Sequence, residues 1–106
     1  MEFSGKKVTV VGTGISGIGA VGLLNAVGAE VVLYDGNEKL KIEDIEKKLG
    51  TYKAEIVLGE LTKELTDSSD LLVISPGVPI DSPVVKAFEA AGVPVWGEVE
   101  LAYAFD

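Results

Sequence analysis

Residues 10–19, with the sequence VVGTGISGIG, decide the predicted fold. A β-branched run at residues 7–11 leads into this stretch and predicts a buried strand. Small residues dominate positions 15–27, which predicts a helix that ends at Gly28. The glycines between strand and helix have the spacing G-x-G-x-x-G, which in this context indicates a phosphate-binding loop.

The rest of the chain alternates in the same way between predicted strands and helices. Apolar runs predict strands at residues 30–35, 54–58, 70–75 and 93–96. Helices are expected after Asn37, with Asn37 as the cap and Ile42, Ile45 and Leu49 on one face, after the Ser82 cap, and at residues 98–105. Residues 62–69 fit a short helix or an irregular crossover.

This alternation predicts an α/β fold, a Rossmann-like, doubly wound parallel sheet of five strands with helices on both faces. The natural strand order is 3-2-1-4-5. A chain of 106 residues is long enough for one core and too short for two, so residues 1–106 are expected to form a single domain.

Composition narrows the possible function. The chain has no cysteine, which fits a cytoplasmic protein, and its apolar runs are too short to span a bilayer. A net charge of −8 makes nucleic acid and anionic membranes poor partners. Without histidine or cysteine, no recognisable catalytic set or metal-ligand set is present, so we expect neither catalytic residues nor a metal site.

All nine basic residues are lysines. Because the chain lacks arginine, an anionic ligand must be held by backbone N–H groups or by lysine. The chain also lacks the G-x-x-x-x-G-K-[ST] loop of P-loop ATPases, so it is not expected to hydrolyse ATP alone.

The predicted ligand site is the switch point of the sheet, between the loops after the first and fourth strands. In the first loop, Gly12 permits a tight turn, Gly14 lets an anion approach the backbone, and Gly17 lets the helix pack closely. The N–H groups of Ile15 and Ser16 at the helix start then bind phosphate. The alternative is that these glycines serve packing only.

Two further segments border the same crevice. Asp35 ends the second predicted strand 18 residues after Gly17, at the place where an acidic residue usually accepts hydrogen bonds from a ribose. The alternative is a turn or capping aspartate. Gly36 and Asn37 leave N–H groups open to a base. The segment Ser75-Pro76-Gly77 offers a hydroxyl and a rigid backbone opposite the glycine loop, or it is an ordinary turn.

Four motifs together carry a family resemblance: GTGISG at 12–17, Asp35, SPGVPIDSP at 75–83 and GEVEL at 97–101. Across essentially the whole chain they resemble the N-terminal domain of Mur ligases, and most nearly the branch that adds D-glutamate. The resemblance implies that the glycine loop binds UDP rather than a nicotinamide cofactor. Family members often have threonine and arginine where this chain has Gly36 and Asn37.

By that resemblance Ile15 and Ser16 contact the diphosphate, Asp35, Gly36 and Asn37 lie beside the uridine, and the second turn closes the other side of the uracil. The predicted UDP-binding set is Gly12, Thr13, Gly14, Ile15, Ser16, Gly17, Asp35, Gly36, Asn37, Ser75, Pro76 and Gly77.

The resemblance also implies a reaction for the whole enzyme. Such a ligase uses ATP and magnesium to phosphorylate the carboxylate of UDP-N-acetylmuramoyl-L-alanine, and the amine of D-glutamate then attacks the acyl phosphate. The reaction belongs to cytoplasmic peptidoglycan biosynthesis. The central ATPase and C-terminal domains would hold ATP, magnesium and D-glutamate, so residues 1–106 are expected to be non-catalytic by themselves. The residues alone leave two alternatives open: a regulatory NAD(H)-binding module and a structural domain with an empty crevice.

Overall fold

A five-stranded sheet forms the centre of the computed structural model, which describes residues 2–105, so the two end residues of the predicted 1–106 domain lie outside the described range. The strand order is β3-β2-β1-β4-β5, and every pairing is parallel. The predicted fold class and strand order are thereby confirmed. The strands are β1 (Lys7–Val11), β2 (Glu30–Asp35), β3 (Glu55–Leu58), β4 (Leu71–Ile74) and β5 (Val95–Gly97).

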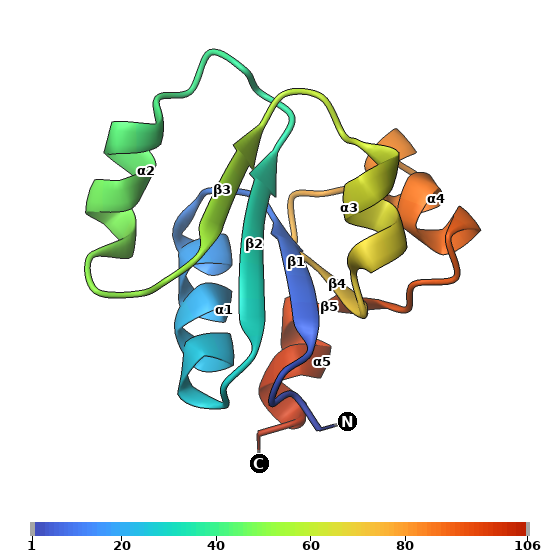
Figure 1. Ribbon diagram of the computed structural model, residues 1–106, viewed down its shortest axis with the longest axis horizontal. Coiled ribbons are helices and arrows are strands. Elements are labelled where there is room, and N and C mark those ends of the chain that lie inside the picture. The colour runs from blue at the N-terminus through green and yellow to red at the C-terminus, as the bar shows by residue number, and fades with distance from the viewer. Residues whose placement is uncertain (1, 106) are drawn as a thin grey trace.

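Within residues 2–105, five helices connect and cover these strands (Figure 1). They are α1 (Ile15–Ala26), α2 (Ile42–Leu49), α3 (Lys63–Ser68), α4 (Pro83–Ala90) and α5 (Glu98–Tyr103). Helices α1, α2 and α5 contribute to the buried cluster on one face of the sheet, and α3 and α4 contribute to the cluster on the other. The sheet is therefore covered on both faces, as a doubly wound fold requires.

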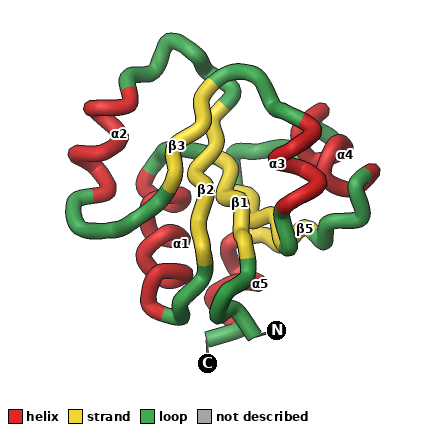
Figure 2. Tube along the Cα trace, viewed as in Figure 1, coloured by secondary structure: helices red, strands yellow, loops and turns green. Residues whose placement is uncertain are grey.

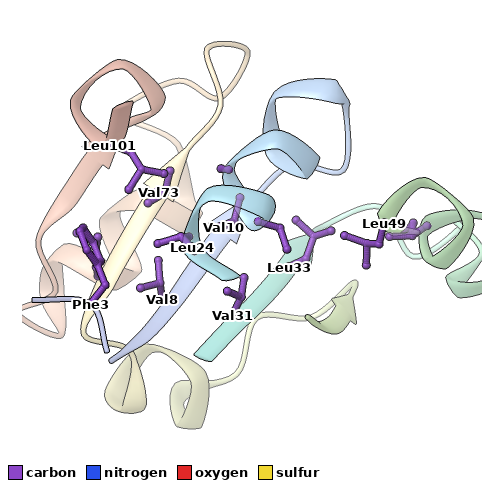
Figure 3. Packing of buried hydrophobic residues seen from close by; sticks show 13 residues of the cluster. Phe3, Val8, Val10, Leu24, Val31, Leu33, Leu49, Val73 and Leu101 are labelled. Carbon is purple, nitrogen blue, oxygen red and sulfur yellow. The ribbon is translucent and has the colours of Figure 1, made fainter. Parts of the chain in front are cut away.

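The alternation of side chains along β1 divides the core into these two clusters. Val8 and Val10 lie on the face of α1, in one cluster with Val31 of β2, Val73 of β4 and Leu24 of α1 (Figure 3). Thr9 and Val11 point to the face of α3 and α4. Thr9 is fully buried, and its hydroxyl lies 2.8 Å from that of Ser69. A buried hydroxyl of β1 thus gains a partner at the C-terminal end of α3, just before β4.

The segment at 62–69, which the sequence left open, is the short helix α3. Its cap is Thr62, whose Oγ1 accepts a hydrogen bond from the N–H of Leu65 at 3.2 Å. Ser82 lies at the predicted cap position of α4, but its buried Oγ has no hydrogen-bond partner among residues 2–105.

The expectation that Asn37 caps the second helix is wrong. Helix α2 begins at Ile42 with Lys41 as its cap. The Asn37 side chain instead accepts a hydrogen bond from the N–H of Lys39 at 3.0 Å, because asparagine readily closes a turn on the backbone two residues ahead. The first helical residue, Ile42, is 45% exposed, so the apolar face of α2 is buried only at Ile45 and Leu49.

The carboxyl ends of β1 and β4 lie side by side, and the chain leaves them toward opposite faces of the sheet. The loop after β1 leads to α1, and the loop after β4 leads to α4 (Figure 2). This divergence creates the switch point at which ligands bind in open α/β sheets.

Candidate functional site

The glycine loop after β1 has a shape that two of its glycines determine. Gly12 has φ = +110°, and its N–H donates to the carbonyl oxygen of Tyr34 at 2.9 Å. Gly17 is buried, and a Cβ on it would lie 1.9 Å from the carbonyl oxygen of Gly12. Any side chain at 17 would therefore push α1 away from the loop.

Gly14 has a different role, because its backbone has an extended conformation that most residue types can adopt (φ −78°, ψ −174°). A Cβ built on Gly14 meets nothing within 4 Å among the described residues. The space above Gly14 is thus open, which is the condition for an anion to approach the backbone.

Helix α1 begins directly after this open position. The first hydrogen bond of its ladder runs from the N–H of Ile18 to the carbonyl oxygen of Gly14 at 3.0 Å. The N–H groups of Ile15, Ser16 and Gly17 precede that bond and are donors outside the ladder. The first turn of α1 contains no acidic residue, so its positive dipole end is not neutralised locally.

The second predicted loop is joined to the first. Ser75 Oγ donates a hydrogen bond to the carbonyl oxygen of Val11 at 3.0 Å, and a Cβ on Gly12 would lie 3.0 Å from the same Oγ. A turn follows, closed by the N–H of Val78 and the carbonyl oxygen of Ser75 at 2.9 Å, with Pro76 exposed. The Ser75 hydroxyl proton is already used, so its oxygen offers a ligand an acceptor rather than a donor.

Asp35, at the end of β2, is tied to the glycine loop from the other side. Its Oδ2 accepts a hydrogen bond from Thr13 Oγ1 at 3.0 Å, and its Oδ1 accepts one from the N–H of Asn37 at 3.0 Å. The bond to Asn37 is that of a turn aspartate, whereas the bond to Thr13 links the end of β2 to the glycine loop after β1. Gly36 is exposed beside this carboxylate.

Tyr34 and Gly59, which the sequence analysis did not single out, form a hydrogen-bonded link to the backbone of Asp35. Tyr34 donates through its hydroxyl to the carbonyl oxygen of Gly59 at 2.5 Å, and the N–H of Gly59 donates to the carbonyl oxygen of Asp35 at 2.9 Å. Burial raises the pKa of Tyr34, and the negative charge of Asp35 raises it further. No local sequence signal marked these residues, because Gly59 lies beside Asp35 only once the parallel register pairs Asp35 with Leu58.

Open hollows border the site on two sides. One of about 370 Å³ is lined by Gly14, Ile15, Ile18 and Lys48, which brings a lysine that the sequence analysis had not named next to the glycine loop. Another of about 360 Å³ runs from Ser16 to Pro76 between α1 and α5. The second hollow therefore brings Ser16, at the start of α1, and Pro76, in the turn after β4, to one surface.

A further hollow, of about 560 Å³, lies at the opposite edge. It is lined by residues 28–32 and 53–55 together with Asn25, and none of the predicted residues borders it. It offers neither a helix N-terminus nor open glycine backbone at a strand end, so we place the candidate site at the glycine loop on chemical grounds.

Residues 2–105 contain neither a metal-ligand cluster nor a membrane-spanning helix. No group of three or more histidine, cysteine, aspartate or glutamate side chains is arranged to hold a metal ion. None of the helices in that range has the length and apolar character needed to cross a membrane.

Solved structures share this fold at low sequence identity. A pseudomurein peptide ligase type C from Methanothermus fervidus superposes with a TM-score of 0.72 at 22% identity, over 95% of this chain and 20% of that one. A shikimate dehydrogenase from Aquifex aeolicus gives 0.62 at 14% identity, over 95% of this chain and 45% of that one. At these identities the likeness concerns the fold alone.

Sequence relatives are much closer. The chain is 62% identical over 106 residues to the "UDP-N-acetylmuramoylalanine--D-glutamate ligase" of Lachnospira eligens, and 53% identical to the protein of the same name from Lachnoclostridium phytofermentans. The alignments cover 100% and 99% of this chain but only 24% and 23% of those relatives.

A family model described as "Mur ligase MurD-like, N-terminal domain" matches residues 6–97, which include the glycine loop, Asp35 and the turn after β4. The chain therefore belongs to the MurD-like Mur ligase family and contains the N-terminal domain of that family.

Proposed function

We propose that residues 1–106 form the domain that binds the UDP end of UDP-N-acetylmuramoyl-L-alanine in an ATP-dependent ligase that adds D-glutamate during peptidoglycan biosynthesis. The relatives' name supports the reaction, and the loop geometry supports the nucleotide. The observation that carries the proposal is the pair of N–H donors of Ile15 and Ser16, which follow directly after Gly14, where the space beside the backbone is open.

The diphosphate is bound by backbone rather than by side-chain charge. The open space at Gly14 lets the diphosphate approach the backbone. The N–H groups of Ile15 and Ser16 then donate hydrogen bonds to phosphate oxygens, and the dipole of α1 favours the negative charge. This mode suits a chain without arginine. Charge-assisted bonds of this kind are about twice as strong as neutral ones, so a few of them suffice to hold the anion.

The nucleoside lies beside the diphosphate, between the two outer loops. Asp35 accepts hydrogen bonds from it, and the exposed backbone of Gly36 and Asn37 borders the base. The turn that begins at Ser75 closes the other side, where the rigid Pro76 limits movement.

The role of such a domain in the reaction is positioning. Binding energy from the remote UDP group fixes the substrate so that its carboxylate stays near the reacting groups. The chain spans about a quarter of the length of its curated relatives. We assign ATP, magnesium and D-glutamate to parts of the ligase outside residues 1–106, and the whole reaction to the cytoplasm.

The proposal is tested by titrating the 106-residue chain, labelled with ¹⁵N, with UDP, with UDP-N-acetylmuramoyl-L-alanine and with NAD⁺. We expect both uridine ligands to bind more tightly than NAD⁺ and to shift the amide resonances of Gly14, Ser16 and Asn37. Tighter binding of NAD⁺ would contradict the proposal and favour a regulatory NAD(H)-binding module. The absence of binding by all three would favour a structural domain.

A matched pair of variants locates the site. Gly14→Ala adds a methyl group in the space reserved for the anion, whereas Gly19→Ala adds one in α1, where nothing lies within 4 Å among the described residues. Losing the charge-assisted bonds is worth about 1.5–3 kcal/mol, so we expect Gly14→Ala to weaken UDP binding by about 10-fold or more. Gly19→Ala should bind UDP as the unmodified chain does.

A further inference from the structure

Thr13 is the one hydroxyl-bearing side chain inside the G-x-G of the glycine loop, and it faces the protein. Its side chain is buried, with the residue only 7% exposed, and its Oγ1 donates to Asp35 Oδ2 at 3.0 Å. The two residues are 22 positions apart: Thr13 lies in the loop after β1, and Asp35 is the last residue of the neighbouring strand β2. This hydroxyl is therefore directed at Asp35 and not at the space above the loop.

The carboxylate of Asp35 is held at both oxygens. Thr13 donates to Oδ2, the N–H of Asn37 donates to Oδ1, and the N–H of Gly59 fixes the backbone carbonyl of the same residue at 2.9 Å. An ionised carboxylate has about four lone-pair sites, so each oxygen keeps acceptor capacity after these bonds. The remaining sites have a fixed direction because the donors come from two separate segments.

A carboxylate fixed in this way can pair with only one kind of ligand group. Asp35 is half-buried at the edge of the crevice, and an ionised carboxylate only accepts hydrogen bonds. The ligand group opposite must therefore be a donor. Within a uridine nucleotide, the donors are the ribose hydroxyls and the N–H of the base.

We propose that Thr13 is a positioning residue that holds Asp35 ready to accept a hydrogen bond from the nucleoside, and that this pair selects ligands with a donor there. The inference rests on the proposed UDP-binding function. It differs from the sequence-based expectation, in which Thr13 belongs to the residues that touch UDP.

A competing explanation is that Thr13 is only a buried polar group that has found a partner. The two explanations differ in whether the effects of Thr13 and Asp35 on ligand affinity are coupled. If Thr13 acts through Asp35, its effect on ligand affinity disappears when Asp35 is absent; if it only stabilises the fold, its effect is independent of Asp35.

The experiment is a double-mutant cycle on UDP affinity, measured by titration calorimetry with Thr13→Val, Asp35→Ala and the double variant. We expect Thr13→Val to weaken UDP binding by about three- to tenfold, the range of a single hydrogen bond, and to have no further effect in the Asp35→Ala background. Thr13→Ser should restore the affinity because it restores the hydroxyl.

A ligand-free measurement checks the geometry. The three-bond couplings of Asp35 report its χ1 angle, and we expect one rotamer in the unmodified chain and in Thr13→Ser but averaged rotamers in Thr13→Val. Thermal unfolding identifies any variant that is not folded at the titration temperature. Thr13→Ala then replaces Thr13→Val in the cycle.

The outcomes separate the two proposals. If the unmodified chain does not bind UDP, both the proposed function and this inference are overturned. If it binds UDP and Thr13→Val binds equally well, or is weakened equally in both backgrounds, only the role of Thr13 is overturned. Titration with 2′-deoxy-UDP, 3′-deoxy-UDP and N3-methyl-UDP identifies the donor, since the analogue that lacks it should become insensitive to Thr13→Val. If all three analogues keep their full sensitivity, the selection of a donor is overturned.

Discussion

The hydroxyl of Ser75 at the end of β4 donates a hydrogen bond to the main-chain carbonyl oxygen of Val11 at the end of β1, across 3.0 Å and 64 positions of sequence. Gly12 makes this contact possible, because a Cβ there would lie 3.0 Å from the same hydroxyl oxygen. The two loops of the candidate site are therefore one connected unit, and a change in either is expected to affect the other.

Ser75→Ala tests this connection. The variant loses one partly buried hydrogen bond, so we expect the free energy of unfolding to fall by about 0.5–1.5 kcal/mol. Urea denaturation followed by circular dichroism measures the change, and Ser4→Ala at an exposed serine is the matched control. Equal stability of the two variants would mean that the bond contributes nothing.

The glycines of the loop should differ sharply in tolerance. In Gly17→Ala the new methyl group would lie 1.9 Å from a backbone oxygen, so α1 must move. We expect a loss of at least about 1–3 kcal/mol, as for overpacked cores. Gly14→Ala meets no protein atom and should unfold at nearly the temperature of the unmodified chain. Thermal melts of the two variants check this, and similar melting temperatures would refute the assigned roles.

The helix caps offer a second matched pair. Thr62→Ala removes the hydrogen bond from the N–H of Leu65 and should cost about 1 kcal/mol. Ser82→Ala removes a buried hydroxyl that has no partner among the described residues, so its cost should stay below about 0.5 kcal/mol. Chemical denaturation of both variants decides the point, and a larger loss for Ser82→Ala would show that its hydroxyl acquires a partner in solution.

Alkaline pH should destabilise the chain through Tyr34. Its pKa is raised above the ordinary value of 10.0, first by burial and then by Asp35, so the folded state holds the phenol proton more tightly than the unfolded state does. The resulting stabilisation is fully present below pH 10 and is lost as the pH rises from there through the folded-state pKa.

Tyr34→Phe removes this titration. The variant loses the hydrogen bond to Gly59 and should be less stable at pH 7, but its stability should fall less steeply above pH 10. Subtracting the two curves of unfolding free energy against pH cancels the contribution of the lysines. Parallel curves would exclude Tyr34 as the source of the alkaline slope.

The sequence predicted the fold class well because its signals are local. β-Branched runs that end at glycine and small-residue helices follow one another, and parallel strands joined by helices have few solutions for their order. The prediction failed at Asn37, where two local options competed: capping a helix and closing a turn. The chain forms the turn, in which the side chain of Asn37 accepts a hydrogen bond from the N–H of Lys39, and α2 then begins at Ile42.

The glycine loop, its place after a buried strand and the likeness to Mur ligases are readable from the sequence, since each depends on residues adjacent in the chain or on motif identity. The directions of the hydroxyls of Thr13 and Ser75 depend on the fold. Both donate to protein acceptors on neighbouring strands, and those acceptors come within reach only when the parallel register of β2, β1 and β4 is formed. A hydrogen bond depends on distance and angle within fractions of an ångström, which sequence spacing does not specify.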